Sequence, residues 1–433
     1  MSFSARLDAL RPSARKAALL VLMETEKGAP LQAAISNVLD TMPLSKDARR
    51  QATDLAYCCL RAYTRCLFVL KGVYPKFDRF PKPVQHLLLT ACTALLFQDG
   101  APAYAVVNET VSDIRFLAGK GVSGAANGGL RSLLRLGDAV LSQEYYRREG
   151  EGEFEAFCRY TSFPAALGKL LLKECGEEKA RTVMQASFAR PCTCIRLNPK
   201  KEGCSELKEK LVGMNAEPLP GAAGKFGLYF PHGVPADISL SELAAEGRIS
   251  FQAAGSQLAL AALSIDKDSP VWDACAGFGG KTAYLLEAGY NVELASDISF
   301  QRVRMIPGEC SRLGLKKPGL MLCDGTRAPL MRWDGTMILD VPCSGLGVLG
   351  RRPDIKMRHR DLASYVRTQR ALLERALLMV PKGRDIIYMT CTVTRSENQS
   401  LVRDVCHSFG VSLAEEHTVE QPFEGMYACR IRA

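Results

Sequence analysis

The sequence is poor in histidine and has no long apolar segment. Only five histidines occur among 433 residues, and they form no group with the spacing of metal ligands, so we expect no metal site. No uninterrupted apolar run approaches the ~18 residues that a membrane-spanning helix needs, so we expect no membrane partner. The apolar stretch 17–23 follows basic residues as in a signal peptide, but charged residues at 24–27 replace a cleavage site and predict an amphipathic helix instead.

A disulfide framework and a zinc site are also missing, although the chain contains 16 cysteines. The cysteines are irregularly spaced, and neither Cys58-Cys59 nor the pair Cys192 and Cys194 has zinc-ligand spacing. Most of them are predicted to be reduced, buried thiols of a cytoplasmic protein.

The chain is long, globular and basic. At 433 residues it is too long for one ordinary core, so two or three domains are expected. Hydrophobic residues make up 47% and charged residues 24% of the chain, which is typical of a folded protein. The formal net charge of +10 favours a nucleic acid as partner, although many enzymes with neutral partners are mildly basic too.

The N-terminal part, 1–145, is predicted to be all α-helical. Apolar residues recur at helical spacing in 15–26, 47–71 and 83–97, while proline and glycine separate the segments. A polar stretch at 147–153 is typical of a linker.

The rest of the chain has two different patterns. Residues 154–250 are mixed and predict a small α/β domain, with a helix at 164–187, a short strand at 194–198 and a helix at 204–213. From 251 to 433 strands and helices alternate, which predicts a parallel sheet with right-handed crossovers, that is, a Rossmann-like domain. Strands are expected at 270–275, 292–297, 319–323, 336–341, 385–391, 411–415 and 426–432, and helices at 280–288, 299–313, 361–380 and 396–409.

A glycine-rich turn follows the first predicted strand of the last domain. Gly277, Gly279 and Gly280 allow a ligand to approach the backbone closely, and the next helix begins with free N–H groups. Asp297 ends the following strand about 20 residues on, where a carboxylate can bind ribose hydroxyls, and Asp324 ends the third strand, placed to accept from an adenine amine. There is neither a strict Gly-x-Gly-x-x-Gly pattern nor a phosphate-loop lysine, so a cofactor without phosphate, such as S-adenosylmethionine, fits better than a dinucleotide. A purely structural turn is the alternative.

Two cysteines and an aspartate stand at the predicted ends of neighbouring strands. Asp340 lies at the end of the fourth strand, Cys343 follows that strand and Cys391 ends the fifth, at the edge where open α/β sheets bind ligands. The Asp340 carboxylate can accept from the amino edge of a cytosine, although an aspartate in a turn is the plainer interpretation. A thiolate that adds to carbon 6 of a cytosine makes carbon 5 nucleophilic. A buried structural role suits any single cysteine, but two at these positions favour methyl transfer to a pyrimidine carbon.

A basic segment, 350–360, comes directly after this candidate site. It contains five lysines or arginines and one aspartate. Contact of Arg351, Arg352, Lys356 and Arg358 with RNA phosphates is the functional interpretation, and a solvated basic loop is the alternative.

Several motifs together resemble one family. They are Gly279-Gly280-Lys281-Thr282, Asp340 to Cys343, Arg352-Pro353-Asp354-Ile355-Lys356 and Thr390-Cys391. Over nearly its whole length the sequence resembles the bacterial ribosomal RNA small-subunit methyltransferase B family, within the RNA cytosine-5 methyltransferases. The helical part resembles the NusB antitermination fold, and the middle part, with Arg196-Leu197-Asn198, resembles the family's small domain.

The resemblance implies roles for most of these residues. It makes Cys391 the nucleophile and Cys343 the helper in product release, an order that the sequence alone does not give. It places Asp340 in both the base pocket and the cofactor pocket. The residues that it assigns to the cofactor are Cys275, Ala276, Gly277, Phe278, Gly279, Gly280, Lys281, Asp297, Arg302, Asp324 and Asp340.

The sequence therefore predicts a three-part enzyme: a NusB-like RNA-binding domain at 1–145, a small α/β domain at 154–250 and a Rossmann-like methyltransferase at 251–433. We expect a cytoplasmic monomer that uses S-adenosylmethionine to methylate carbon 5 of an unpaired or flipped cytosine in small-subunit ribosomal RNA. One alternative is a transfer-RNA cytosine methyltransferase. The other is a non-catalytic RNA-binding or assembly factor with a decayed methyltransferase fold, since Gly277-Phe278 replaces the family's usual Ala-Pro.

Overall fold

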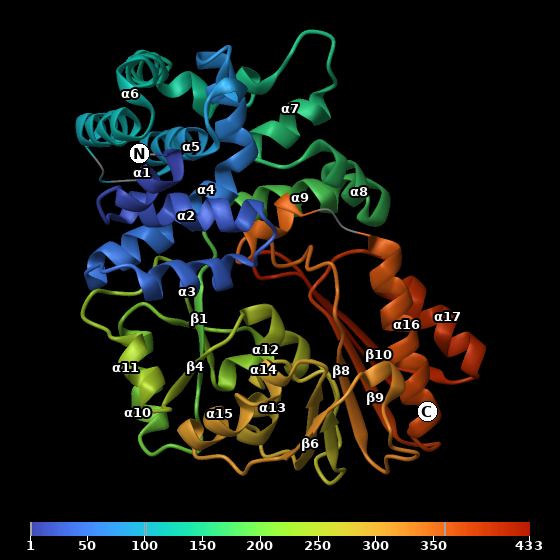
Figure 1. Ribbon diagram of the computed structural model, residues 1–433. Helices are drawn as coiled ribbons and strands as arrows, with labels where there is room; N and C mark the ends of the chain where they lie inside the picture. Colours follow the sequence, from blue (N-terminus) through green and yellow to red (C-terminus); the bar gives the residue numbers. More distant parts are fainter. Residues whose placement is uncertain (1, 99, 101, 359–360) are drawn as a thin grey trace. The chain divides into compact units, whose positions relative to one another are not determined.

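The structure divides into two compact units (Figure 1). The computed structural model describes residues 2–98, 100, 102–358 and 361–433. The first unit contains the chain up to Ala189 together with 349–358, and the second contains 190–348 and 361–433. This division differs from the three predicted domains, because the helices of 153–188 pack with the N-terminal helices and the small sheet shares a unit with the large one. The predicted domain boundaries stay a prediction.

The first unit is built from helices packed on a core of leucine, valine and alanine side chains. Serines begin several of them, as at Ser13, whose Oγ accepts from the Lys16 N–H at 3.1 Å and so satisfies a donor of the first turn. Among the described residues, no helix combines the length and the apolar character needed to cross a membrane. The α-helices are α1 (Phe3–Ala9), α2 (Ala14–Glu26), α3 (Leu31–Thr41), α4 (Lys46–Val73), α5 (Lys82–Phe97), α6 (Ala103–Arg135), α7 (Glu153–Tyr160), α8 (Ala165–Cys175) and α9 (Glu177–Phe188). The 3-10 helices are η1 (Phe77–Arg79), η2 (Gly137–Leu141), η3 (Glu144–Tyr146) and η6 (Pro353–Met357).

Two of the predicted helices are each broken into two. The helix expected at 164–187 is interrupted at Gly176, whose φ of +79° ends α8 and starts α9. The helix expected at 299–313 becomes α14 (Phe300–Val303) and α15 (Ile306–Leu313), because Pro307 has no N–H to continue the first helix and fits the first turn of the second.

A four-stranded antiparallel sheet begins the second unit. Its strand order is β2-β3-β1-β4. The strands are β1 (Thr193–Leu197), β2 (Glu217–Pro218), β3 (Gly227–Phe230) and β4 (Ile249–Phe251), with α10 (Cys204–Gly213) and α11 (Leu240–Ala245) between them. The β1 strand corresponds to the predicted strand at 194–198, and α10 to the helix predicted at 204–213.

A seven-stranded sheet of order β10-β11-β9-β8-β5-β6-β7 forms the rest of this unit. The strands β5 to β9 are parallel, and β11 and β10 join antiparallel at one edge. This arrangement confirms the predicted Rossmann-like methyltransferase fold. The strands are β5 (Val271–Asp273), β6 (Val292–Asp297), β7 (Gly319–Leu322), β8 (Thr336–Asp340), β9 (Asp385–Thr390), β10 (Ser412–Val419) and β11 (Met426–Arg432).

Both faces of the large sheet are buried. On β9, Ile386 and Tyr388 belong to one apolar cluster, and Ile387 and Met389 to another, because successive strand residues point to opposite faces. Parallel strands that are covered on both faces consist of continuous apolar residues. Such apolar runs are the pattern from which the strands were predicted. The first cluster includes α16 (Leu362–Met379) and α17 (Gln399–Phe409), and the second includes α12 (Ala254–Ala261), α13 (Gly280–Glu287) and α15.

Candidate active site

Two thiols lie in contact at the carboxyl edge of the large sheet. The strands β8 and β9 are parallel neighbours with Asp340 opposite Met389, so the chain segments that follow them emerge side by side. Cys343 and Cys391 are half-buried in these segments, with their Sγ atoms 3.2 Å apart. The Cys391 backbone N–H also donates to the Cys343 Sγ at 3.3 Å. The structure therefore brings together two residues that are 48 positions apart in the chain.

The contact makes the two thiols chemically different. Hydrogen bonding from the Cys343 S–H lowers the pKa of Cys391, and the nearby Lys281 ammonium lowers it further, against burial and the Asp340 carboxylate. The same hydrogen bond, together with burial, holds the pKa of Cys343 well above its usual range. Because the thiolate is the nucleophilic form, these opposite shifts favour Cys391 over Cys343 as a nucleophile.

Asp340 ends β8 beside the thiols and forms an ion pair with Lys281 on α13. Both side chains are partly exposed, at 31% for Asp340 and 13% for Lys281, so the pair is open to a ligand. Burial alone would lower the pKa of Lys281, but the Asp340 carboxylate outweighs it and raises the pKa above its usual value. Lys281 therefore stays an ammonium that orients the carboxylate.

The glycine turn and Asp297 form one connected group. The Gly277 N–H donates to Asp297 Oδ2 at 3.0 Å and the Ser299 N–H donates to Oδ1 at 2.9 Å, which fixes the carboxylate at the end of β6. Arg302 on α14 pairs with the same carboxylate at 3.8 Å. The turn leads directly into α13, which begins at Gly280. The other residues predicted to bind the cofactor in this segment are Cys275, Ala276, Phe278 and Gly279.

The space around this turn fits S-adenosylmethionine. A Cβ built on Gly277 or on Gly280 would meet nothing within 4 Å, so the backbone faces open space on this side. Ile298, which follows Asp297, is 68% exposed, and Phe278 is 66% exposed. An exposed apolar side chain beside Asp297, the carboxylate predicted to bind ribose, suits an adenine ring. Sequence reasoning missed Ile298, although its place directly after the strand-ending aspartate was a usable signal.

Two other carboxylates near this edge differ in their surroundings. Asp324 is exposed and caps the short helix 325–327, with Oδ1 accepting from the N–H and the hydroxyl of Thr326 at 2.9 and 2.8 Å. Asp273 is fully buried and accepts from Thr282 at 2.6 Å, while its Oδ1 has no hydrogen-bond partner among the described residues. Burial raises the pKa of Asp273 to about 6.

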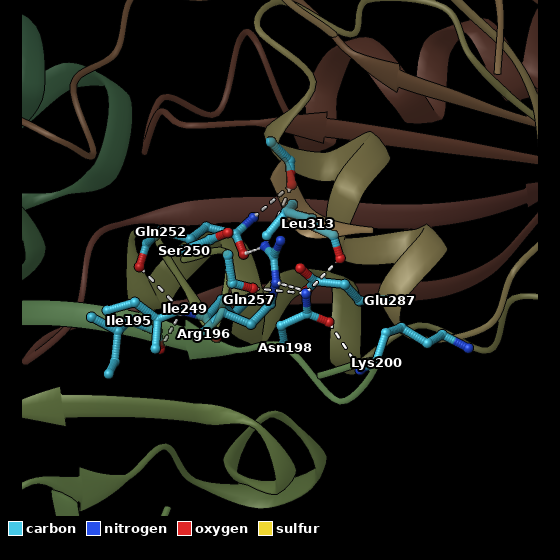
Figure 2. Close-up of polar contacts among 12 residues, drawn as sticks. Ile195, Arg196, Asn198, Lys200, Ile249, Ser250, Gln252, Gln257, Glu287 and Leu313 are labelled. Carbon is cyan, nitrogen blue, oxygen red and sulfur yellow. Dashed lines mark hydrogen bonds and ion pairs between the residues drawn. The ribbon is translucent and has the colours of Figure 1, made fainter. Parts of the chain in front are cut away.

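The motif Arg196-Leu197-Asn198 joins the small sheet to the large one (Figure 2). The Arg196 guanidinium pairs with Glu287 on α13 and with Gln252, and also donates to the Gly280 carbonyl at 3.4 Å. The Asn198 amide donates to the carbonyls of Gly247 and Leu313 at 2.9 and 2.8 Å. These contacts hold the first residue of α13, and so support the glycine turn.

The basic segment is more structural than the sequence suggested. Asp354 is fully buried and pairs with Arg352 at 3.3 Å and with Arg358 at 2.8 Å. Lys356 is 4% exposed, and its ammonium donates to the Arg61 carbonyl at 2.9 Å. Burial, aided by the Arg61 charge, lowers the pKa of Lys356 to about 7.

The prediction that Lys356 contacts RNA phosphates is therefore corrected, because its ammonium is buried and bonded within the first unit. Arg352 and Arg358 are half-buried in their pairs with Asp354, and Arg351 is half-buried beside them. Contact of these three arginines with RNA stays a prediction.

Comparison with known proteins gives a consistent result over the whole chain. The family model described as 16S rRNA methyltransferase RsmB/F matches residues 260–423, and the NusB family model matches residues 12–135. The probable ribosomal RNA small subunit methyltransferase B of Synechocystis is 30% identical over 90% of this chain and 88% of its own length. The corresponding protein of Bacillus subtilis is 27% identical over 95% of this chain and 90% of its own.

Solved structures share the fold. The crystal structure of PH0851 aligns with a TM-score of 0.73 at 19% identity, over 98% of this chain and 99% of that one. NSun6 from Pyrococcus horikoshii aligns with a TM-score of 0.54 at 20% identity, over 63% of this chain and 98% of that one. The predicted NusB-like helical part and the methyltransferase part are both confirmed.

Proposed function

Because the chain belongs to the family of the ribosomal RNA small subunit methyltransferases B, we propose that it methylates carbon 5 of a cytosine in small-subunit ribosomal RNA through a covalent adduct with Cys391. The family makes it an RNA methyltransferase with S-adenosylmethionine as cofactor, as the sequence predicted. The observation that carries the finer proposal is the 3.2 Å contact between two thiols whose pKa values are shifted in opposite directions.

Cys391 acts as the nucleophile in this proposal. Its thiolate adds to carbon 6 of the cytosine, which forms the S–C6 bond and makes carbon 5 electron-rich. Once carbon 5 carries the methyl group, a base takes up the carbon-5 proton and the electrons of that C–H bond form the C5–C6 double bond. The S–C6 bond then breaks, and its electron pair returns to Cys391 as the thiolate. Cys343, which holds its proton in contact with Cys391, assists this release. With two thiols, one can attack carbon 6 while the other assists release of the product.

Asp340 binds the base. Its carboxylate stands beside the thiols and accepts from the cytosine amino group, while Lys281 keeps it oriented and supplies a positive charge next to the ring. A preorganised charge pair stabilises charge that develops on the ring during addition, since it needs no reorganisation when the reaction occurs.

The cofactor is held by the glycine turn and the carboxylates at the ends of β6 and β7. When bound, S-adenosylmethionine supplies the methyl group. Asp297 binds the ribose hydroxyls with the lone pairs that its two backbone N–H bonds leave unused. Ile298 covers a face of the adenine, Asp324 accepts from the adenine amine, and Arg302 keeps Asp297 in place.

Trapping of the covalent complex tests this proposal. Labelled small-subunit ribosomal RNA is incubated with the protein and S-adenosylmethionine and separated on a denaturing gel. Cys343→Ala should give a slow-migrating RNA band, because the adduct forms and is not released, whereas Cys391→Ala should give none and should not methylate. Cys204→Ala, which removes a half-buried thiol of the small α/β part, is the matched control and should behave as the parent.

The opposite banding pattern would exchange the two cysteines. Methylation retained in Cys391→Ala would refute the covalent mechanism. Methylation found on a base other than cytosine, read by mass spectrometry of the digested RNA, would refute the proposed target.

A further inference from the structure

One fully buried carboxylate of the second unit has no part in the chemistry described so far. Glu397 lies in the segment between β9 and α17, with no exposed surface. Its two oxygens accept four hydrogen bonds among the described residues, at distances from 2.5 to 2.9 Å. A buried charge is costly unless it is fully bonded, so an acidic residue at this place requires an explanation.

The donors come from both cysteine segments. Ser344, directly after Cys343, donates its N–H to Oε1 at 2.8 Å and its hydroxyl to Oε2 at 2.5 Å. Thr394, three residues after Cys391, donates its hydroxyl to Oε2 at 2.6 Å. One carboxylate therefore ties the turn that carries Cys343 to the turn that carries Cys391.

The same group extends to the residues on either side of the thiols. Gln369 on α16 donates to Glu397 Oε1 and to the Pro342 carbonyl, both at 2.9 Å, and so holds the residue before Cys343. The hydroxyls of Ser344 and Thr392 lie 2.7 Å apart and join the residues that directly follow the two cysteines. Each cysteine is thus held through its immediate neighbours.

We propose that Glu397 is the positioning residue that keeps the Cys343 and Cys391 sulfurs in contact for the covalent reaction. The proposal rests on the proposed function for its purpose, but the contact itself can be measured without RNA. The carboxylate is suited to this because it only accepts hydrogen bonds, so every surrounding donor must point toward it. Errors in placement matter, since a displacement of ~1 Å at a reacting group can cost about 100-fold in rate.

Three variants separate positioning from general stability. Glu397→Ala removes all four acceptor contacts. Glu397→Gln keeps one oxygen for the Ser344 N–H and for Gln369, and its amide can donate to the hydroxyls of Ser344 and Thr394 if these rotate. Asp385→Asn is the matched control, because Asp385 is a buried carboxylate at the opposite end of β9, where it pairs with Arg430 and Arg432.

The first measurement uses disulfide formation as a proximity probe in the protein alone. Diamide oxidises two thiols to one disulfide, and the two electrons and two protons reduce it to a hydrazine. Mass spectrometry follows the peptide pair that contains Cys343 and Cys391. Glu397→Ala should form this disulfide at least about ten-fold more slowly than the parent, by the same sensitivity to placement. Glu397→Gln should come close to the parent, and Asp385→Asn should match it.

The second measurement is the pH dependence of Cys391 alkylation by iodoacetamide. The Glu397 charge raises the pKa of both thiols, so Glu397→Gln should shift the profile to lower pH, which a change in stability alone would not do. The charged or titratable groups that act on Cys391 are Cys343, Asp340, Lys281 and Glu397.

The third measurement is methylation. For Glu397→Ala the kcat should fall with an unchanged KM for S-adenosylmethionine. A parent-like rate of disulfide formation in Glu397→Ala would overturn the positioning role. If that variant does not fold, Thr394→Val, which removes one of the hydroxyl contacts to Glu397, takes its place, and a parent-like rate of disulfide formation in it would overturn the role instead. Slow disulfide formation in Glu397→Ala in a protein that never methylates cytosine would leave the positioning role standing and refute the proposed function.

Discussion

The carboxyl group of Asp273 should make the second unit less stable at neutral pH than at acidic pH. Its side chain is fully buried next to the glycine turn, Thr282 bonds one oxygen, and the other has no partner among the described residues. Burial raises its pKa from 3.8 to about 6. The folded protein therefore binds this proton more tightly than the unfolded chain. The contribution of Asp273 to the free energy of unfolding falls as pH rises from about 4 to about 6 and is constant above that.

The size of the effect follows from these two pKa values. The raised pKa of Asp273 lowers the free energy of unfolding by about 3 kcal/mol at pH 8 and by roughly half as much at pH 5, where the folded protein keeps most of the proton, by linkage between the folded and unfolded values. Asp273→Asn removes this cost but introduces an amide that has an unmade hydrogen bond, which costs about 1–3 kcal/mol. The amide penalty is the same at both pH values and cancels from their difference. The gain from Asp273→Asn should thus be larger at pH 8 than at pH 5 by roughly 1 to 2 kcal/mol.

Urea unfolding followed by tryptophan fluorescence measures this difference. The chain has two tryptophans, Trp272 and Trp333, and both lie in the second unit, so the signal reports that unit alone. Asp385→Asn is the control for loss of a buried carboxylate and should destabilise the unit at pH 8, because Asp385 is paired with arginines. An Asp273→Asn effect that is equal at pH 5 and pH 8 would refute the assignment of a buried, proton-binding carboxyl group.

Three more predictions concern binding and reactivity. Asp297→Ala should weaken S-adenosylmethionine binding in titration calorimetry by about 1.5–3 kcal/mol, the scale of a charged hydrogen bond, and an unchanged affinity would exclude ribose contact. Cys391 should react with iodoacetamide at lower pH than Cys343, because their contact lowers the first pKa and raises the second, and peptide mapping after brief labelling checks this order. RNA affinity should fall steeply with salt, and Arg351→Ala should make that slope shallower in filter binding, whereas Lys356→Met, at a buried position, should not. Equal slopes for Arg351→Ala and the parent would identify the segment as structural.

The elements that carry the site were readable from local pattern. The strands β6 and β11 match the predicted ranges 292–297 and 426–432, because apolar runs that are bounded by polar residues specify strands in a sheet that is covered on both faces. Asp297 and Asp340 were found for the same reason, since each ends such a run. The pattern fixes which edge of the sheet a residue reaches, and that was enough to predict that Cys343 and Cys391 stand at the same edge, on neighbouring strands.

What the sequence did not reveal depends on contacts between distant segments. Glu397 is one of 46 acidic residues, and nothing in its neighbourhood marks it as buried, because its donors come from positions 344 and 369 as well as from nearby. Lys356 reads as part of an exposed basic run until Arg61 on α4 is seen to accept from it. Burial of a charged group is decided by tertiary contacts, and charge patterns along the chain do not report them.

The place of segment 349–358 has a consequence for the order in which the protein can fold. This segment completes the first unit, where the Gly350 carbonyl accepts from Arg61 at 3.0 Å and Lys356 binds the Arg61 carbonyl. Domains generally form as units while the chain emerges from the ribosome, N-terminal parts first. Here the N-terminal unit must wait until most of the methyltransferase sheet has been synthesised before its last piece is available. The two units are therefore linked in their biogenesis, because the helical unit includes a segment that is synthesised only after strands of the large sheet.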